Sequence, residues 1–156
     1  MLQITQYTGA VSDELMQLLL MADPDPEAVG RYIGAAEVLV AEEAKRLVGV
    51  AVVSAEAGVA ELKNLAVAEA HRGRGIAKAM IAAAQGRARS KGAVEMVVGT
   101  GNSSVGQLCL YQKCGFRMLR IEKDYFAVYP EPIIENGIRC LDRVVLRADL
   151  RSGFEA

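Results

Sequence analysis

The sequence predicts an α/β fold in which a mostly antiparallel, mixed sheet of about six or seven strands is flanked by about four helices. The 156 residues, 52% of them hydrophobic and 24% charged, suit one globular domain, residues 1–156, with a core of its own. Strand-like and helix-like segments follow in the order β-α-α-β-β-β-α-β-α-β-β, and no repeat or linker interrupts them.

The first half of the chain predicts a strand, two helices and a three-stranded meander. Residues 2–7 alternate apolar and polar side chains, and residues 11–21 place apolar groups at helical spacing behind Ser12, a suitable N-cap. A turn rich in aspartate and proline follows, and Pro26 fits the first turn of a second helix. Three strands rich in β-branched residues are expected at 37–42, 46–54 and 58–67.

The longest helix is predicted after these strands. Strong helix formers fill residues 75–91, and Gly92 is the residue type favoured just past a helix end. Residues 93–99 then predict a strand.

The remaining elements are a short helix and two strands. Ser104 and Gln107 have the spacing of a capping box that opens a helix through Cys114, which Gly115 closes. The expected strands at 115–122 and 139–150 are separated by the segment 123–138, which is too long for a simple hairpin turn but contains a good turn signal at 135–137.

Composition excludes several classes of function. The net charge is −1 and the 18 basic residues are scattered, which argues against nucleic acid as the main partner. No apolar run reaches the roughly 18 residues that span a bilayer, and the first residues lack the basic and apolar regions of a signal peptide. We therefore expect a cytoplasmic protein without a membrane partner.

Metal and cysteine chemistry are also disfavoured. The three cysteines form no CxxC pair and suit reduced thiols, and Cys109 and Cys114 are expected to pack as small apolar groups. His71 is the single histidine, so a histidine-rich zinc site cannot form, and we expect its side chain to be solvated. No metal site is predicted.

A glycine-rich loop links the strand that ends near Val67 to the longest helix. Gly73 and Gly75 let backbone amides approach a ligand, and the helix start adds N–H groups and a positive dipole end, so a pyrophosphate fits there. Arg72 and Arg74 would add charge-assisted contacts. Taken alone, the loop could equally be a solvated turn. The loop has the spacing neither of a Rossmann fingerprint nor of a P-loop. Nicotinamide and nucleoside triphosphate cofactors are therefore disfavoured.

Two motifs resemble those of one enzyme family. Arg72-x-x-Gly75-x-Ala77 resembles the [Q/R]-x-x-G-x-[G/A] signature of the GNAT acetyltransferases, and the preceding ELKNLAV resembles the fourth strand of that family. About forty residues later, the sequence LYQKCGF at 110–116 resembles the LYxKxGF signature that ends the family's fourth helix. The resemblance extends over residues 2–122 and more loosely to 149.

The resemblance implies a GNAT-type domain that binds acetyl-CoA. The backbone of Leu65, Ala66 and Val67 would pair with the pantetheine arm, where the fourth strand separates from the fifth and opens a V-shaped cleft. Many members carry an asparagine seven residues before the tyrosine; here Ser104 has that position and Asn102 is the nearest asparagine, and both are candidate cofactor contacts. The phosphates would be bound by the loop and helix start, namely Arg72, Gly73, Arg74, Gly75, Ile76 and Ala77, with Lys78 nearby.

The resemblance also assigns catalytic roles. An amine with a pKa near 10 must lose a proton before it attacks, and Glu61 matches the place of a glutamate that acts as base through water. Tyr111 would protonate the departing CoA thiolate, and a backbone N–H near Val67, at a strand bulge, would bind the oxyanion. The alternatives are a solvent-facing strand glutamate and a tyrosine that packs its helix on the sheet.

The segment 123–138 lies where this family often shapes the acceptor pocket or a dimer contact. Its aromatic and acidic side chains could hold a cationic amine, although an ordered surface loop is an equal alternative. The groups concerned are Tyr125, Phe126, Tyr129, Asp124, Glu131 and Glu135.

The expected function is transfer of an acetyl group from acetyl-CoA to a primary amine of a small molecule or protein by direct attack in a ternary complex. A catalytically silent acyl-CoA sensor or regulatory module and a purely structural domain are the alternatives. A homodimer is expected by analogy with the family.

Overall fold

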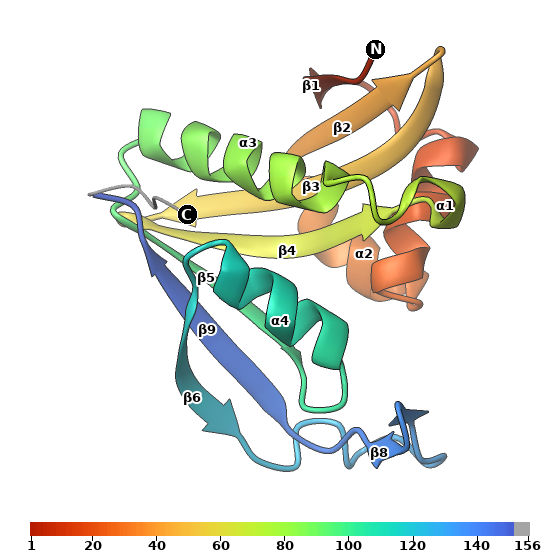
Figure 1. Ribbon diagram of the computed structural model, residues 1–156, viewed down its shortest axis with the longest axis vertical. Coiled ribbons are helices and arrows are strands. Elements are labelled where there is room, and N and C mark those ends of the chain that lie inside the picture. The colour runs from red at the N-terminus through yellow and green to blue at the C-terminus, as the bar shows by residue number, and fades with distance from the viewer. Residues whose placement is uncertain (152–156) are drawn as a thin grey trace.

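The computed structural model describes residues 1–151 and confirms the predicted α/β class (Figure 1). Residues 152–156, which the expected domain of 1–156 includes, lie outside the described residues. The helices are α1 (Asp13–Ala22), α2 (Pro26–Ile33), α3 (Ile76–Ser90) and α4 (Val105–Lys113), with a short 3-10 helix η1 (Glu69–His71). The strands are β1 (Gln3–Tyr7), β2 (Glu37–Glu43), β3 (Arg46–Glu56), β4 (Val59–Val67), β5 (Glu95–Gly101), β6 (Arg117–Glu122), β7 (Ile134–Glu135), β8 (Ile138–Arg139) and β9 (Arg143–Asp149).

Seven strands form one sheet in the order β1-β2-β3-β4-β5-β9-β6, and β7 and β8 form a separate hairpin. Neighbouring strands of the large sheet are antiparallel except β4 and β5, which are parallel. A parallel pair needs a long crossover, and here η1 and α3 supply it.

The sheet splits between β4 and β5. The two strands pair only where residues 59–61 face residues 95–97, whereas β4 pairs with β3 over its whole length. Figure 1 shows β4 and β5 diverging beyond their paired ends, with α4 beside the opening. Among the described residues, one edge of β4 therefore has no strand partner along its second half.

Each face of the sheet has its own core. Met80 and Ile81 of α3 and Leu62 of β4 are buried on one face, while Leu15 and Leu19 of α1 are buried on the other. Truncation of such a side chain to alanine typically costs about 2–5 kcal/mol of stability. The packing of α3 on one face and of α1 on the other therefore holds β4 in place.

The predicted helix ends are mostly confirmed. The Ser12 hydroxyl accepts a hydrogen bond from the Leu15 N–H at 3.1 Å, and Gly92, just beyond α3, has a φ of +88°. The capping box at Ser104 is wrong: Ser104 precedes α4, but its hydroxyl donates to Glu135 at 3.1 Å instead of capping the helix. A capping hydroxyl accepts from a backbone N–H and belongs to a residue with extended backbone, whereas Ser104 has φ −83° and ψ 66°, outside that region.

The C-terminal part of the fold differs most from the prediction. The last strand begins at Arg143 rather than 139, because Arg139 belongs to the β7–β8 hairpin and the N–H groups of Leu141 and Asp142 donate to Asn102 instead of to β5. The expected turn at 135–137 is confirmed as the β7–β8 connection, where Asn136 and Gly137 have φ values of +56° and +73°.

Candidate active site

The unpaired edge of β4 presents backbone groups to the opening of the sheet. The Ala68 N–H donates to the Val48 carbonyl of β3 at 2.8 Å. Because backbone groups point to alternate edges along a strand, those of Leu65 and Val67 face the opening. The expectation for Ala66 is not met: it pairs with Val50 of β3, and its backbone groups point away from the opening.

A groove runs from this edge to the glycine-rich loop. It consists of two adjoining cavities of about 390 and 440 Å³. Val67, Arg72, Ala77 and Leu110 line both of them, so the cavities are continuous. The cavity at the loop is also lined by Lys78 and Lys113, which makes that end of the groove positive.

The loop and the start of α3 form an anion site of backbone N–H groups. Gly73 and Gly75 have φ values of +78° and +80°, a region that disfavours any side chain. Gly75 is the N-cap of α3 and supplies no capping side chain, so the first-turn amides of α3 remain available. The positive end of the helix dipole adds to their attraction for a phosphate.

The two arginines of the loop contact the protein itself. The Arg72 Nε donates to the Val67 carbonyl at 3.1 Å, which ties the loop to the end of β4. The Arg74 guanidinium binds Glu43 of β2 at 3.1 and 3.2 Å. Arg74 is therefore directed to β2, which does not support its expected contact with a phosphate.

The surroundings of Tyr111 bear on both of its predicted roles. Only 5% of the residue is exposed, and its ring packs edge-on against Phe116 at 5.7 Å, as the packing alternative requires. The hydroxyl oxygen nevertheless keeps some exposure to solvent, and within residues 1–151 it makes no hydrogen bond. Burial, with a smaller effect of Cys114, raises the pKa of Tyr111 to about 12, so the phenol remains protonated at neutral pH.

Glu61 lies at the closed end of the opening, on the other face of the sheet. Its neighbours Ala60 and Leu62 are buried beneath α3, so the Glu61 side chain projects to the opposite face. It is one third exposed and forms ion pairs with Lys63 at 3.0 Å and with Arg143 at 3.7 Å. Glu61 is therefore partly exposed, as the alternative of a solvent-facing glutamate requires, but its carboxylate is also held by two cations.

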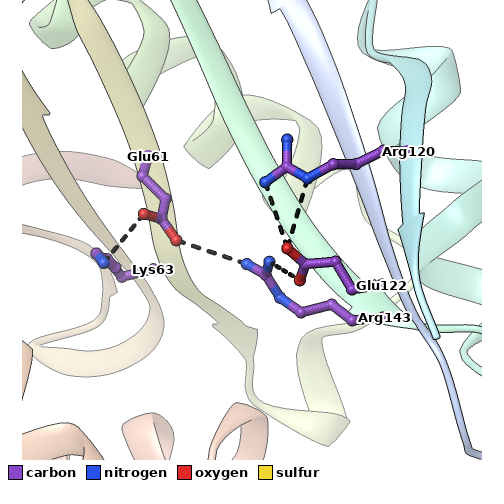
Figure 2. Close-up of polar contacts among 5 residues, drawn as sticks. All are labelled: Glu61, Lys63, Arg120, Glu122 and Arg143. Carbon is purple, nitrogen blue, oxygen red and sulfur yellow. Dashed lines mark hydrogen bonds and ion pairs between the residues drawn. The ribbon is translucent and has the colours of Figure 1, made fainter. Parts of the chain in front are cut away.

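A row of charged side chains extends from Glu61 across the sheet, as Figure 2 shows. Glu122 of β6 lies 2.7 Å from Arg143 of β9 and 3.4 Å from Arg120. Arg143 reaches over Gly99 of β5, where an added Cβ would lie 2.3 Å from the guanidinium. Arg143, Glu122 and Gly99 are not predicted from the sequence, because only the pairing of the strands brings them together.

The bulge in β4 also differs from the prediction. The register shifts between Val52 and Val53 of β3, which leaves Lys63 as the extra residue of β4. The bulge therefore lies near Glu61 rather than at Val67. The candidate oxyanion donor at Val67 is an ordinary N–H group of the open strand edge.

The side chains of Asn102 and Ser104 are engaged elsewhere. The Asn102 amide donates to the Arg139 carbonyl and accepts from the N–H groups of Leu141 and Asp142. The Ser104 hydroxyl donates to Glu135. Both residues anchor the chain between β6 and β9, so this geometry does not support their expected contacts with a cofactor.

The segment 123–138 is ordered by contacts with the rest of the site. The Tyr125 ring lies 5.5 Å from the Arg143 guanidinium, and Glu135 accepts hydrogen bonds from the hydroxyls of Ser103 and Ser104. Tyr125 thus already faces a cation, and the Glu135 carboxylate is occupied. These contacts argue against the expectation that the two residues hold a cationic amine.

Residues 1–151 contain neither a cluster of potential metal ligands nor a membrane-spanning helix. No group of three or more histidine, cysteine, aspartate and glutamate side chains is arranged there to bind a metal ion. None of the helices within this range combines the length and the apolar character needed to cross a membrane.

Comparison with known proteins gives consistent matches. A family model for the GNAT acetyltransferase domain matches residues 34–118. The uncharacterized N-acetyltransferase YvbK of Bacillus subtilis is 43% identical over 141 residues, which cover 89% of this chain and 91% of YvbK.

Two solved structures are similar over nearly their whole length. A Bacillus subtilis acetyltransferase in complex with CoA has a TM-score of 0.91 and 40% identity, covering 96% of this chain and 99% of that one. A GNAT family acetyltransferase from Elizabethkingia anophelis with acetyl-CoA bound has a TM-score of 0.88 and 39% identity, covering 95% and 97%.

Proposed function

Because this chain belongs to the GNAT acetyltransferase family, we propose that it transfers an acetyl group from acetyl-CoA to a primary amine by direct attack within a ternary complex. The open edge of β4 carries the proposal. Leu65 and Val67 face a groove that leads to the positive loop at the start of α3. An extended amide-containing arm that ends in a pyrophosphate matches both parts of this groove.

Acetyl-CoA supplies the acetyl group as an activated thioester. In our proposal its pantetheine amides pair with the backbone of Leu65 and Val67, in the manner of an added strand. Its phosphates lie at the N–H groups from Gly73 to Lys78, with Lys113 adding positive charge. The related structures that contain CoA or acetyl-CoA support this assignment.

The chain provides a base and an acid on opposite faces of the sheet. Glu61 accepts a proton from the acceptor ammonium, directly or through water, since the neutral amine is the nucleophile. Tyr111 donates a hydrogen bond, and then a proton, to the departing thiolate, because its raised pKa keeps the phenol protonated. The Val67 N–H binds the oxygen that becomes negative during attack.

A covalent route through cysteine is disfavoured. Burial raises the pKa of the Cys114 thiol, which lowers the fraction of reactive thiolate, and Cys109 is exposed. Direct attack by the amine needs neither thiol.

A cytoplasmic homodimer is also part of the proposal. The unpaired cysteines suit a reducing compartment. Met118, Leu119 and Ile121 are exposed on β6, the last strand of the sheet, where a second copy of the chain could cover them.

The first test is titration of the purified protein with acetyl-CoA by calorimetry, followed by measurement of thiol release with a panel of amines. We expect stoichiometric binding and amine-dependent release of CoA. Binding without turnover on any amine would favour the acyl-CoA sensor, and absence of binding would contradict the proposed function altogether.

A further inference from the structure

Arg143 has hydrogen-bonding capacity that no other residue of 1–151 uses. Its Nη1 donates to Glu122 at 2.7 Å, whereas its Nη2 lies 3.7 Å from Glu61, too far for a hydrogen bond. No residue of the described chain accepts a hydrogen bond from Nε or Nη2. The Arg143 side chain as a whole is 22% exposed, so it is partly desolvated but not fully covered.

The position of Arg143 connects it to the reaction. The side chain starts on β9, passes over Gly99 of β5 and ends near Glu61 of β4. Figure 2 shows its guanidinium directed toward Glu61 on one side and Glu122 on the other. Gly99 lies two residues beyond Val97, the last residue of β5 that pairs with β4. The guanidinium therefore lies where the sheet opens, on the face that carries the proposed base.

We propose that Arg143 binds the carboxylate of the acceptor and that the acceptor is a free α-amino acid, an inference that rests on the proposed function. Nε and Nη2 form the side-on fork that binds both oxygens of a carboxylate. Standard bond lengths place the amine nitrogen of an α-amino acid about 3 Å from its carboxylate oxygens. The 3.7 Å between Arg143 and Glu61 therefore suits a ligand that offers a carboxylate to one and an ammonium to the other.

The neighbouring groups hold this fork in place and favour an anion. Glu122 fixes Nη1, and Arg143 in turn lowers the pKa of the Glu122 carboxyl, so the pair remains charged at neutral pH. The Tyr125 ring lies 5.5 Å from the guanidinium. The row contains three cations and two carboxylates, because Lys63 and Arg120 pair with Glu61 and Glu122, and it is therefore positive overall.

The test compares each common amino acid with its carboxamide, which retains the amine and lacks the negative charge. Both ligands are titrated by calorimetry into the complex of the enzyme with CoA, so that no turnover occurs. We expect the preferred amino acid to bind at least about tenfold more tightly than its amide, as charge-assisted hydrogen bonds typically provide. In Arg143→Gln the preference should fall to within about twofold.

Two further variants make the result specific. Arg143→Lys keeps the charge without the fork and should lose most of the preference. Arg147→Gln is the matched control, since Arg147 is on the same strand and binds Glu95 away from the opening; it should keep the preference of the wild type. Acetyl-CoA affinity, measured on every variant, reports whether each protein is folded.

Three results would overturn the inference: equal binding of acid and amide by the wild type, binding of neither, or an equal loss of preference in Arg147→Gln. If acetyl-CoA binds and amines without a carboxylate are acetylated as well as amino acids, the inference alone fails. If acetyl-CoA does not bind, the proposed function fails with it.

Discussion

The two faces of the sheet at the β4–β5 opening are built in different ways. On the face of α3 and α4, the groove takes its backbone groups and helix start from one continuous stretch, residues 65–78, and α4 adds the side chains of Leu110 and Lys113. On the opposite face, the site uses charged side chains of β4, β6 and β9. These strands are far apart in the sequence and meet only because the sheet orders them side by side.

In our proposals, the first face binds the cofactor that the family shares and the second face binds the acceptor. A backbone site binds any chain that follows the strand edge and ends in phosphates, so it suits a ligand common to many enzymes. A side-chain site can change with a single substitution, as at Gly99, where any side chain would displace Arg143. Variants on the first face should therefore alter acetyl-CoA binding or thiolate departure, and variants on the second should alter dependence on the amine.

The largest effect is expected for Tyr111→Phe. Loss of the phenol removes the proton donor for the thiolate, and general acid catalysis typically contributes about 10²–10⁴-fold. We expect kcat to fall about 100-fold, while the affinity for acetyl-CoA, measured by calorimetry, stays within about twofold because the ring still packs on Phe116. A variant as fast as the wild type would show that Tyr111 only packs.

Unfolding at alkaline pH tests whether the folded protein raises the pKa of Tyr111. The folded protein raises the pKa of Tyr111 from 10.0 to about 12, so between these values the unfolded chain loses the proton first. The stabilising effect is fully present below pH 10 and is lost as the pH rises towards 12, up to about 2–3 kcal/mol. Urea unfolding at pH 9 and 11 should therefore show a steeper loss of stability for the wild type than for Tyr111→Phe.

A smaller effect is expected on the other face for Glu61→Gln. The amide cannot accept the proton, so kcat/KM for the amine should fall about tenfold or more at neutral pH. It should recover as the pH approaches the pKa of the free amine, because the amine is then already neutral. Lys63 and Arg143 already form ion pairs with the carboxylate and compete with the ammonium for it, which places the effect at the lower end of the usual range.

The control for Glu61 is Glu95→Gln, because Glu95 is also a strand carboxylate paired with an arginine, yet it lies opposite Val59, two residues further from the opening than Glu61. Amine kinetics of this variant should match the wild type, and acetyl-CoA affinity should be unchanged in both. A loss in Glu61→Gln that does not depend on pH would contradict the role as base.

The same comparison explains how far the sequence could predict the molecule. The strands, helices and glycine loop follow from local patterns. The family could be predicted because its two motifs lie within continuous segments, and the family model confirms it. The contacts of Asn102 and Ser104 were missed, because their partners lie about thirty to forty residues further along the chain. Arg143 gives no local signal, since its importance depends on Gly99 beneath it and on Glu61 two strands away.

The smallest effect should come from the backbone of the groove, where Gly75 and Gly86 form a matched pair on the same helix. A Cβ would meet no atom within 4 Å at either position, but only Gly75 has a positive φ, +80°. Gly75→Ala should therefore destabilise the loop by about 1 kcal/mol and weaken acetyl-CoA binding about fivefold, whereas Gly86→Ala should stabilise α3 by about 0.5–1 kcal/mol without changing affinity. Calorimetric titration and thermal unfolding of both variants measure these changes. If both alanines had the same effect on affinity, the positive φ of the loop would not matter for the ligand, and the contrast between a backbone site and a side-chain site would lose its main support.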